Sequence, residues 1–324
     1  MREAGLHPPS LQHLAWKYWL ERNDWPGSRS YVLTDGTQLL AHLAVIPTSC
    51  RLESGVAKIA SVVDWAARPR EAGAGTRLMK HVGTLADALL AINPNPSASK
   101  LMRLMGYQTH GTATGYVRTL FPLRLLRRPS GPKWKLLPRL ARSTLWSITA
   151  PSPAHDAWQA RPIRPDRMDG IASVLPQGRP GLAVLERALP QLRYMLDCPT
   201  VPIRLFGFER ERHTAGYFVL AFVPGQARLV DCWTESREPS DWRALIQCAV
   251  MQAKRADDVA ELAAWASDPF LAQCLTECGF HARSAVPIYL RPSGECSIAA
   301  RTLRVQMIDS DAAYLYAGGR EHWA

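Results

Sequence analysis

The sequence predicts an α/β protein with two tandem domains, each a mixed, mostly antiparallel sheet flanked by helices. Three observations support this prediction. The chain of 324 residues exceeds the usual size of a single domain. Stretches with helical spacing alternate with short extended stretches, and the same order occurs before and after a stretch rich in Pro, Arg and Lys. We therefore expect an N-terminal domain at 1–120, a basic connector at 121–160 and a C-terminal domain at 161–324.

The N-terminal domain is predicted to open with a helix and to continue as an antiparallel meander. Apolar residues between 11 and 20 recur at helical spacing, and the loop at 23–27 ends that helix. The predicted elements after it are strands at 30–33, 38–47 and 58–67, a helix from 76 to about 88, a strand at 89–92, a helix that Ser97 caps and Gly106 ends, and a strand at about 115–120.

The C-terminal domain is predicted to repeat this order. Its elements are strands at 201–209, 214–223 and 227–234, a helix capped by Ser240 and running to Arg255, a strand at 259–266 and a helix at 269–278. The run LMRLMGY at 101–107 aligns with CLTECGF at 274–280, and both occupy the same place in the order. We interpret the C-terminal domain as a second copy of the N-terminal fold.

Composition narrows the class of protein. The chain has 39 Lys and Arg against 28 Asp and Glu, and the net charge of +11 favours phosphate-bearing partners without distinguishing nucleotides, nucleic acids and anionic lipids. The seven cysteines form no C-x-x-C pair, and H-E-x-x-H and G-x-S-x-G are absent, so we expect neither a metal cofactor nor a hydrolase. Residues 1–10 lack a signal-peptide core and no apolar run is long enough to cross a bilayer, which favours a cytoplasmic location.

The stretch at 62–79, VVDWAARPREAGAGTRLM, carries the most information about function. It passes from a strand through a tight loop directly into a helix. Glycines leave backbone N–H groups free to turn toward one anion, and the helix N-terminus adds partial positive charge. Arg70 and Arg77 would add charge-assisted contacts to phosphates. The alternative is an ordinary strand-to-helix turn.

This loop resembles the pyrophosphate-binding signature of the GNAT acyltransferase superfamily, R/Q-x-x-G-x-G/A, with Arg70, Gly73 and Gly75 at the matching positions. The run at 101–107 resembles the later helix of that family, which ends in Gly-Phe or Gly-Tyr. The resemblance covers about 30–118 with the motif and 203–290 without it. It implies acetyl-CoA or another acyl-CoA as co-substrate, bound by Trp65, Ala66, Ala67, Arg70, Glu71, Ala72, Gly73, Ala74, Gly75, Thr76, Asn93 and Asn95.

The second copy lacks the signature. It offers ESREPS at 235–240, where two acids repel a diphosphate and a proline removes a donor. We therefore expect the C-terminal copy to be silent as a coenzyme site and either to complete the acceptor cleft or to support the first domain.

The resemblance also implies a mechanism. The free edge of the strand ending near Ala67 would pair with the pantetheine arm, and a backbone N–H there would polarise the thioester carbonyl. Asp64 is the predicted base for the acceptor amine, directly or through water; the alternative is a carboxylate that satisfies loop amides or pairs with Arg68. The family often places a proton-donating Tyr four residues before the Gly-Phe, and Met102 stands there.

The start of the N-terminal domain also departs from the family. Members of the family begin with a strand before their first helix, whereas this chain offers only residues 1–10. Either the sheet starts one strand short, or the segment at 302–308 fills the vacant edge.

The resemblance implies that the protein is an acyl-CoA-dependent N-acyltransferase, most simply an N-acetyltransferase, that acts on an amine of a small molecule or sugar. Proteins with this appearance often act in surface-polysaccharide pathways. One alternative is a Fem-type transferase, which also pairs two GNAT-like folds but uses aminoacyl-tRNA. The other is a catalytically silent coenzyme-binding or scaffold protein.

The basic run at 118–142 alternates cations with Leu and Trp, so contact with an anionic membrane surface is one interpretation. The other is a linker packed across both domains, because prolines interrupt any long amphipathic helix. We expect no specific nucleic-acid partner, and the oligomeric state is left open.

Overall fold

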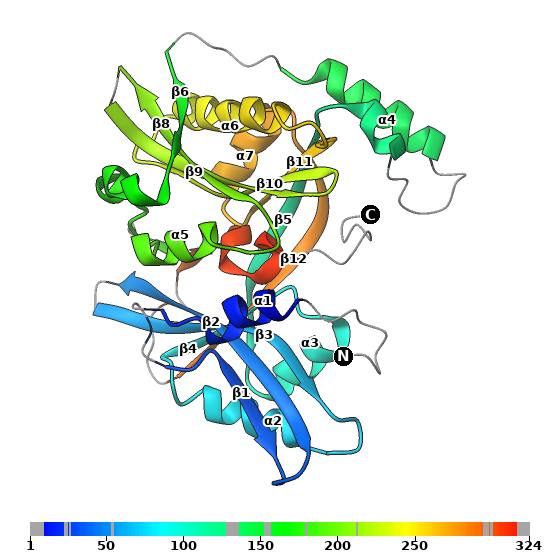
Figure 1. The fold of residues 1–324 in the computed structure, drawn as a ribbon, viewed down its shortest axis with the longest axis vertical. Coiled ribbons are helices and arrows are strands. Elements are labelled where there is room, and N and C mark those ends of the chain that lie inside the picture. The colour runs from blue at the N-terminus through cyan, green and yellow to red at the C-terminus, as the bar shows by residue number, and fades with distance from the viewer. Residues whose placement is uncertain are drawn as a thin grey trace.

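One continuous sheet of eleven strands runs through both halves of the molecule, in the order β1-β2-β3-β4-β12-β5-β11-β10-β9-β8-β6 (Figure 1). The computed structural model describes residues 10–22, 25, 27–52, 55–127, 136–151, 157–178, 181–211, 213–293, 298 and 301–315. The mixed, mostly antiparallel sheet flanked by helices agrees with the predicted fold class.

The N-terminal half has the predicted order of elements. It consists of α1 (Leu11–Leu14) with the π-helical turn η2 (Ala15–Trp19), β1 (Ser30–Thr34), β2 (Leu39–Leu52), β3 (Gly55–Ala67), α2 (Ala74–Val82), β4 (Ala88–Ile92), α3 (Pro96–Leu104) and β5 (Gln108–Thr119). Helix α2 ends well before the predicted residue 88. The cap of α3 is Asn95 rather than Ser97, because the Asn95 side chain accepts a hydrogen bond from the Ala98 N–H.

The C-terminal half follows the same order after a different start. Its elements are β6 (Gln159–Ile163), η5 (Pro165–Val174), β7 (Leu182–Val184), α5 (Leu189–Leu196), β8 (Ile203–Arg210), β9 (His213–Val223), β10 (Gln226–Thr234), α6 (Pro239–Lys254), β11 (Glu261–Ala266), α7 (Pro269–Glu277) and β12 (His281–Pro292). The chain then ends in β13 (Thr302–Arg304) and the short turns η7 (Met307–Asp309) and η8 (Asp311–Ala313).

The connector is more ordered than the sequence indicates. It contains the turn η3 (Pro122–Arg127) and the 14-residue helix α4 (Leu136–Thr149). The expectation that prolines prevent such a helix is wrong, because Pro138 lies in the first turn of α4, where a backbone N–H has no helical partner to lose.

The two halves exchange their last strands. Strand β12 of the C-terminal half lies between β4 and β5 and pairs antiparallel with both. Strand β5 of the N-terminal half in turn pairs antiparallel with β11. The boundary predicted at residue 120 therefore comes directly after β5, a strand that pairs with the C-terminal half. Separating the halves would break strand pairings on both sides of β12 and β5.

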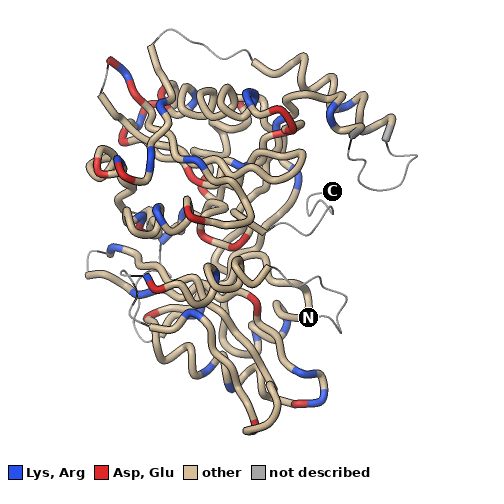
Figure 2. Tube along the Cα trace, viewed as in Figure 1, with Lys and Arg blue, Asp and Glu red and all other residues tan. Residues whose placement is uncertain are grey.

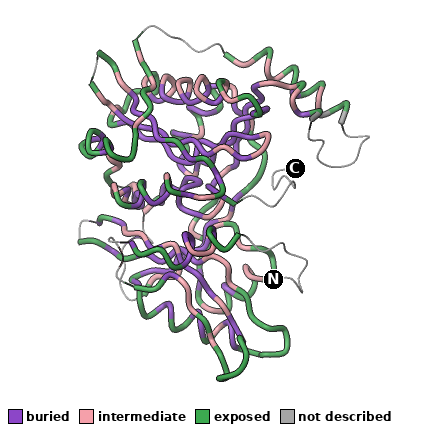
Figure 3. The backbone as a smooth tube through the Cα atoms, viewed as in Figure 1, coloured by how far each residue is buried: buried purple, intermediate pink, exposed green. Residues whose placement is uncertain are grey.

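The hydrophobic core forms two clusters (Figure 3). One lies where α2 packs against the N-terminal strands and includes Leu43, Met79, Leu89 and Met102. The other, much larger, continues from the N-terminal half into the C-terminal half and includes Ile59 as well as the Trp16 and Tyr194 rings, which stack with centroids 4.6 Å apart. The face that carries α1 is therefore shared between the halves.

The C-terminal segment does not extend the N-terminal sheet. Strand β13 pairs in parallel with β7, in a separate two-stranded sheet. The prediction that 302–308 could fill the vacant edge is therefore wrong, and β1 is the edge of the large sheet within the described residues.

A buried ion-pair network anchors the C-terminal segment. The Arg187 guanidinium donates to Asp231 Oδ2 at 3.0 Å and pairs with Asp309 Oδ1 at 2.8 Å, while the Tyr217 hydroxyl donates to Asp231 Oδ2 at 2.7 Å. Burial lowers the pKa of Arg187, but the charges of Asp231 and Asp309 outweigh burial and hold it above its ordinary value. Each charge in this network is paired, as burial requires.

We predict that Arg187→Met destabilises the protein by about 3–5 kcal/mol, because it leaves two carboxylates buried without a cation. Urea unfolding followed by circular dichroism measures this change. The matched control is Arg51→Met, which breaks the largely exposed pair of Arg51 with Glu186 and should cost less than about 1 kcal/mol. Equal losses in the two variants would contradict the assignment of the Arg187 network as an anchor.

Candidate active site

Strands β3 and β4 separate after a short parallel pairing, and we call the place where they part the crevice. The two strands pair in parallel at only three positions, Ile59 with Ala88, Ala60 with Leu89 and Ser61 with Leu90. Strand β3 continues to Ala67, so its last residues have no neighbouring strand on that side. The Arg68 N–H donates to Leu40 O of β2 at 2.9 Å. Because orientations alternate along a strand, Ala67 turns its backbone groups toward the crevice.

Asp64 occupies a β-bulge beside this free edge. The register between β2 and β3 shifts between His42 and Ala44, and Asp64 has a φ of 50°. Positive φ is uncommon for a residue with a side chain, and a bulge redirects the side chain of the strand that carries it. The backbone carbonyl of Asp64 lies 3.2 Å from His42 Nδ1.

The Asp64 side chain meets two residues of the first helix. The Tyr18 hydroxyl donates to Asp64 Oδ2 at 2.8 Å, and the buried Lys17 ammonium forms an ion pair with the same oxygen. Lys17 Nζ also lies 3.4 Å from Asp311 Oδ2 in the C-terminal segment. Burial and then the Asp64 charge raise the pKa of Tyr18, so this hydroxyl stays protonated as a donor. Burial raises the pKa of Asp311, although Lys17 acts in the opposite direction.

The alternative expected for Asp64 was a carboxylate that satisfies loop amides or pairs with Arg68, and the structure shows other partners. The partners of its carboxylate are Lys17 and Tyr18. The Arg68 guanidinium instead contacts the Gln38 side chain. No sequence motif singled out Lys17 or Tyr18. The only available signal is a lysine within a short helix that is otherwise largely apolar.

The loop after β3 leaves a set of amides free. The N–H groups of Glu71 and Ala74 bond within the loop. Among the hydrogen bonds of the described residues, none engages the N–H of Gly73, Gly75 or Thr76. Gly73 has a φ of 80°, a conformation that favours glycine, and its exposed backbone directly precedes the nine-residue helix α2. These amides and the α2 N-terminus together suit an anion.

Close packing explains the second glycine. A Cβ at Gly75 would lie 3.0 Å from Trp65 Nε1 and 3.2 Å from the Ala67 Cβ. The Trp65 indole donates to Gly75 O at 3.1 Å, which ties the end of β3 to the start of α2. The Arg70 and Arg77 side chains are exposed on this loop and helix.

Most of the predicted coenzyme residues form one continuous line. Residues 65–67 lie on the free edge of β3, 70–73 in the loop and 74–76 in the first turn of α2. Asn93 follows β4 and lines a cavity of about 270 Å³ together with Trp265, Ser284 and Met307. Asn95 is engaged as the cap of α3, where its Oδ1 accepts from the Ala98 N–H at 2.8 Å.

Comparisons with known proteins agree with this geometry. No family model and no curated protein matches the chain. A protein of unknown function from Enterococcus faecalis, a probable N-acyltransferase, aligns with a TM-score of 0.55 and 12% identity over 81% of this chain and 61% of its own. GCN5-related N-acetyltransferases (GNATs) from Anabaena variabilis and Kribbella flavida align with TM-scores of 0.58 and 0.51 and 14% identity, over 90% and 84% of this chain and 67% and 62% of theirs.

This chain has the GNAT fold. It spans roughly three fifths to two thirds of the length of these solved proteins. At 12–14% identity the likeness concerns the fold alone.

The position of the usual GNAT tyrosine is a packing position in this chain. Met102 is buried on α3 within the cluster that contains Met79 and Tyr107. The departure noted in the sequence is therefore part of the core.

The C-terminal half has a similar crevice, but the chain itself closes it. Strands β10 and β11 pair in parallel from 226–229 to 261–264, and β10 continues to Thr234. There the Gln306 side chain accepts from the Cys232 N–H at 3.1 Å and donates to Cys232 O at 3.2 Å. The Gln306 side-chain amide thus bonds both backbone groups of Cys232, as a peptide group of a neighbouring strand would. At Cys232 the edge of β10 therefore has no free donor or acceptor for a ligand arm.

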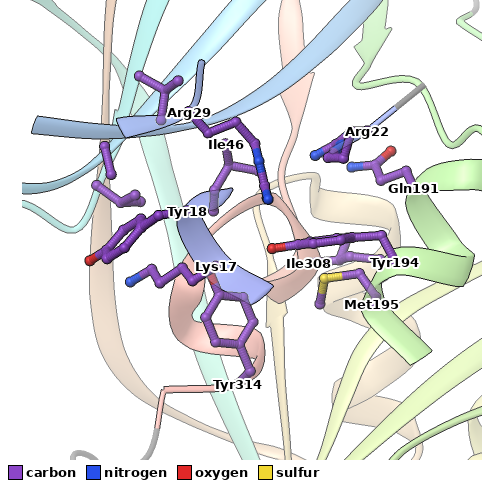
Figure 4. Close-up of a pocket in the computed structure, with 13 residues that line it drawn as sticks. Lys17, Tyr18, Arg22, Arg29, Ile46, Gln191, Tyr194, Met195, Ile308 and Tyr314 are labelled. Atoms are coloured by element: carbon purple, nitrogen blue, oxygen red, sulfur yellow. The ribbon is translucent and has the colours of Figure 1, made fainter. Parts of the chain in front are cut away.

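A narrow pocket lies on the other side of Lys17 and Tyr18, between η2, β2, β3, α5 and the C-terminal segment (Figure 4). Its walls include the rings of Tyr194 and Tyr314 and the buried Arg29, whose guanidinium lies 4.8 Å from the centre of the Tyr194 ring. The cavity measures about 10 Å³, which holds about one water molecule. A larger molecule would need these side chains to move.

No group of three or more His, Cys, Asp or Glu residues within the described ranges could hold a metal ion. Within the same part of the chain, no helix is long and apolar enough to cross a membrane.

Proposed function

We propose that the protein is an acyl-CoA-dependent N-acyltransferase, most simply an N-acetyltransferase, whose acceptor is an amine of a small molecule or sugar. One observation carries the proposal. The free edge of β3 leads without interruption into a glycine loop whose Gly73, Gly75 and Thr76 amides have no partner among the described residues. A strand-like arm that ends in a diphosphate fits this sequence of donors.

The donor would bind along the predicted line of residues. The amide groups of a pantetheine arm pair with the edge formed by 65–67, as an added strand does. The diphosphate takes the amides of 73–76 at the α2 N-terminus, and Arg70 and Arg77 add charge. Asn93, at the end of β4, lines a cavity together with residues of β5, β11 and β12, and we expect it to bond the arm.

Asp64 is the proposed base. The acceptor nitrogen forms a bond to the acyl carbon while the carbon–sulfur bond breaks, so the amine must lose a proton and the thiolate must gain one. Lys17 and Tyr18 hold Asp64 Oδ2, and no hydrogen bond among the described residues engages Oδ1. That oxygen can accept the amine proton directly or through water. The raised pKa of Tyr18 makes it a poor acid, so we assign it to holding Asp64 and leave the thiolate to water.

The acceptor side is formed by both halves. Lys17 and Tyr18 line the narrow pocket whose opposite wall is Tyr194 and Gln191 of α5. Because this pocket holds about one water molecule and Asp64 does not line it, we infer that the acceptor amine reaches Asp64 from outside the pocket, where Lys17 of one half lies 3.4 Å from Asp311 of the other. We also propose that the protein acts in a surface-polysaccharide pathway and that it is located in the cytoplasm.

Two other functions make different predictions. A Fem-type transferase would bind aminoacyl-tRNA at physiological salt, whereas the open glycine loop favours a coenzyme diphosphate. A catalytically silent protein, which Met102 in place of the usual tyrosine would allow, would bind acetyl-CoA without turnover.

We predict that Ala72→Glu and Arg70→Glu each weaken acetyl-CoA binding about tenfold or more, because each places a carboxylate where the diphosphate would lie. Both residues are exposed, so the fold should not change. Isothermal titration calorimetry with acetyl-CoA measures the affinity. Ala172→Glu, at an exposed position of η5, is the matched control and should bind like wild type. Equal affinities of wild type and both loop variants would refute the donor site.

We predict that Asp64→Asn lowers kcat about 100-fold or more and leaves the KM for acetyl-CoA within about twofold, because the base acts after the donor is bound. Tyr18→Phe should lower kcat less, since it removes only one contact that holds Asp64. Release of free thiol from acetyl-CoA with a panel of amino sugars and other small amines measures both.

Asp35→Asn is the control for this experiment, since Asp35 only accepts hydrogen bonds from Thr37 and Gln38 in an exposed turn. An unchanged kcat in Asp64→Asn would exclude Asp64 as the base. Binding of acetyl-CoA without thiol release for any amine would instead favour the silent protein.

A further inference from the structure

Helix α4 exposes a stripe of apolar side chains to solvent. Leu137 is 76%, Leu145 59% and Ile148 76% exposed. With Ala141 they recur at the spacing of one helical stripe, which we call the α4 face. The side that packs on the protein instead contains Ser143, which is buried. A helix that only covers the protein surface would turn Leu137, Leu145 and Ile148 toward the protein.

The orientation of α4 is held by specific contacts. The Trp146 ring stacks on His281, with centroids 3.8 Å apart. The guanidinium groups of Arg142 and Arg283 lie 5.0 Å and 4.6 Å from the centre of the same ring. Aromatic stacking and cation–π contacts on one side of the helix keep the α4 face directed away from the protein. Figures 1 and 3 show α4 extending from the body, with an exposed outer surface.

The chain segment that contains α4 carries cations and no acidic residue. From Arg124 to Arg142 the chain carries seven Lys or Arg residues, and the first acidic residue after Arg124 is Asp156. Figure 2 shows no Asp or Glu on α4. The neighbouring turn η3 adds exposed apolar side chains, Leu123 and Leu126. An exposed apolar stripe within a basic segment is the combination that binds anionic lipid surfaces.

We propose that the α4 face docks the protein on an anionic phospholipid bilayer, with α4 lying in the plane of the headgroups. A helix of 14 residues is about 21 Å long and cannot cross a hydrocarbon core of about 30 Å, but it can lie along the interface. The apolar side chains enter the boundary between headgroups and acyl chains, and the cations of the segment attract the lipid phosphates.

A second copy of this chain fits the α4 face less well. In a symmetric pair each α4 would meet the basic segment of the other, and cations of the same sign would repel. A nucleic acid would use the cations but would gain nothing from three exposed aliphatic side chains.

The test is vesicle co-sedimentation at physiological salt with the full chain. Vesicles that contain phosphatidylglycerol should bind wild type about tenfold more tightly than vesicles of phosphatidylcholine alone. The combined variant Leu137→Glu, Leu145→Glu and Ile148→Glu should lose this binding by about tenfold or more, because it removes the apolar stripe and adds repelling charge. Raising the salt concentration should weaken wild-type binding.

A control variant with the same change in charge keeps the result specific. Val32→Glu, Val56→Glu and Leu104→Glu replace side chains that are 57%, 57% and 80% exposed elsewhere on the protein, and should bind vesicles nearly like wild type. Circular dichroism checks that both variants are folded.

Three results would overturn the proposal: no binding of wild type to either vesicle, equal binding to both, or equal losses in the two triple variants. A dimer in sedimentation velocity that only the α4 variant abolishes would reassign the surface to a contact between copies. None of these outcomes depends on catalysis, so the proposed function is tested separately.

Discussion

The short parallel pairing of β3 with β4 is the constraint on which the rest of the site depends. Three residue pairs hold β3 and β4 together, and β3 then continues to Ala67 paired only with β2. The edge exposed in this way is backbone, so its donors and acceptors need a partner from outside the sheet. The bulge at Asp64 lies on the same stretch and places a carboxylate beside that edge.

The C-terminal half shows what happens when the chain itself supplies the partner. Gln306 satisfies Cys232 at the corresponding edge of β10, and the Arg187 network holds the segment that carries Gln306. The same segment reaches the first crevice, where the Ser61 hydroxyl donates to Asp309 O at 3.2 Å and Lys17 lies 3.4 Å from Asp311. One short segment therefore closes the second crevice and lines the first. This segment therefore links the two halves physically.

Local patterns in the sequence were sufficient for most elements and for the glycine loop, because periodicity and turn residues act over a few positions. They could not predict the exchange of β5 and β12, since an apolar strand carries no mark of which neighbour it pairs with. The sequence could not indicate the partners of Asp64 for a related reason: Lys17 and Tyr18 are far from Asp64 in the chain and meet it only in the fold. Helix α4 was missed because Pro138 was treated as a helix breaker when it lies in the first turn.

The exchanged strands also connect the proposed membrane surface with the crevice. Strand β12 begins at His281, which stacks on Trp146 of α4, and its Pro287 carbonyl accepts the Asn93 N–H at the end of β4. Strand β5 runs beside it and leads into η3. Two paired strands are stiff, so a bilayer bound at α4 would hold the crevice at a set distance and orientation. In that arrangement the acceptor would meet the site near the membrane surface, and a lipid-linked or membrane-associated amine would reach it more readily than one free in solution.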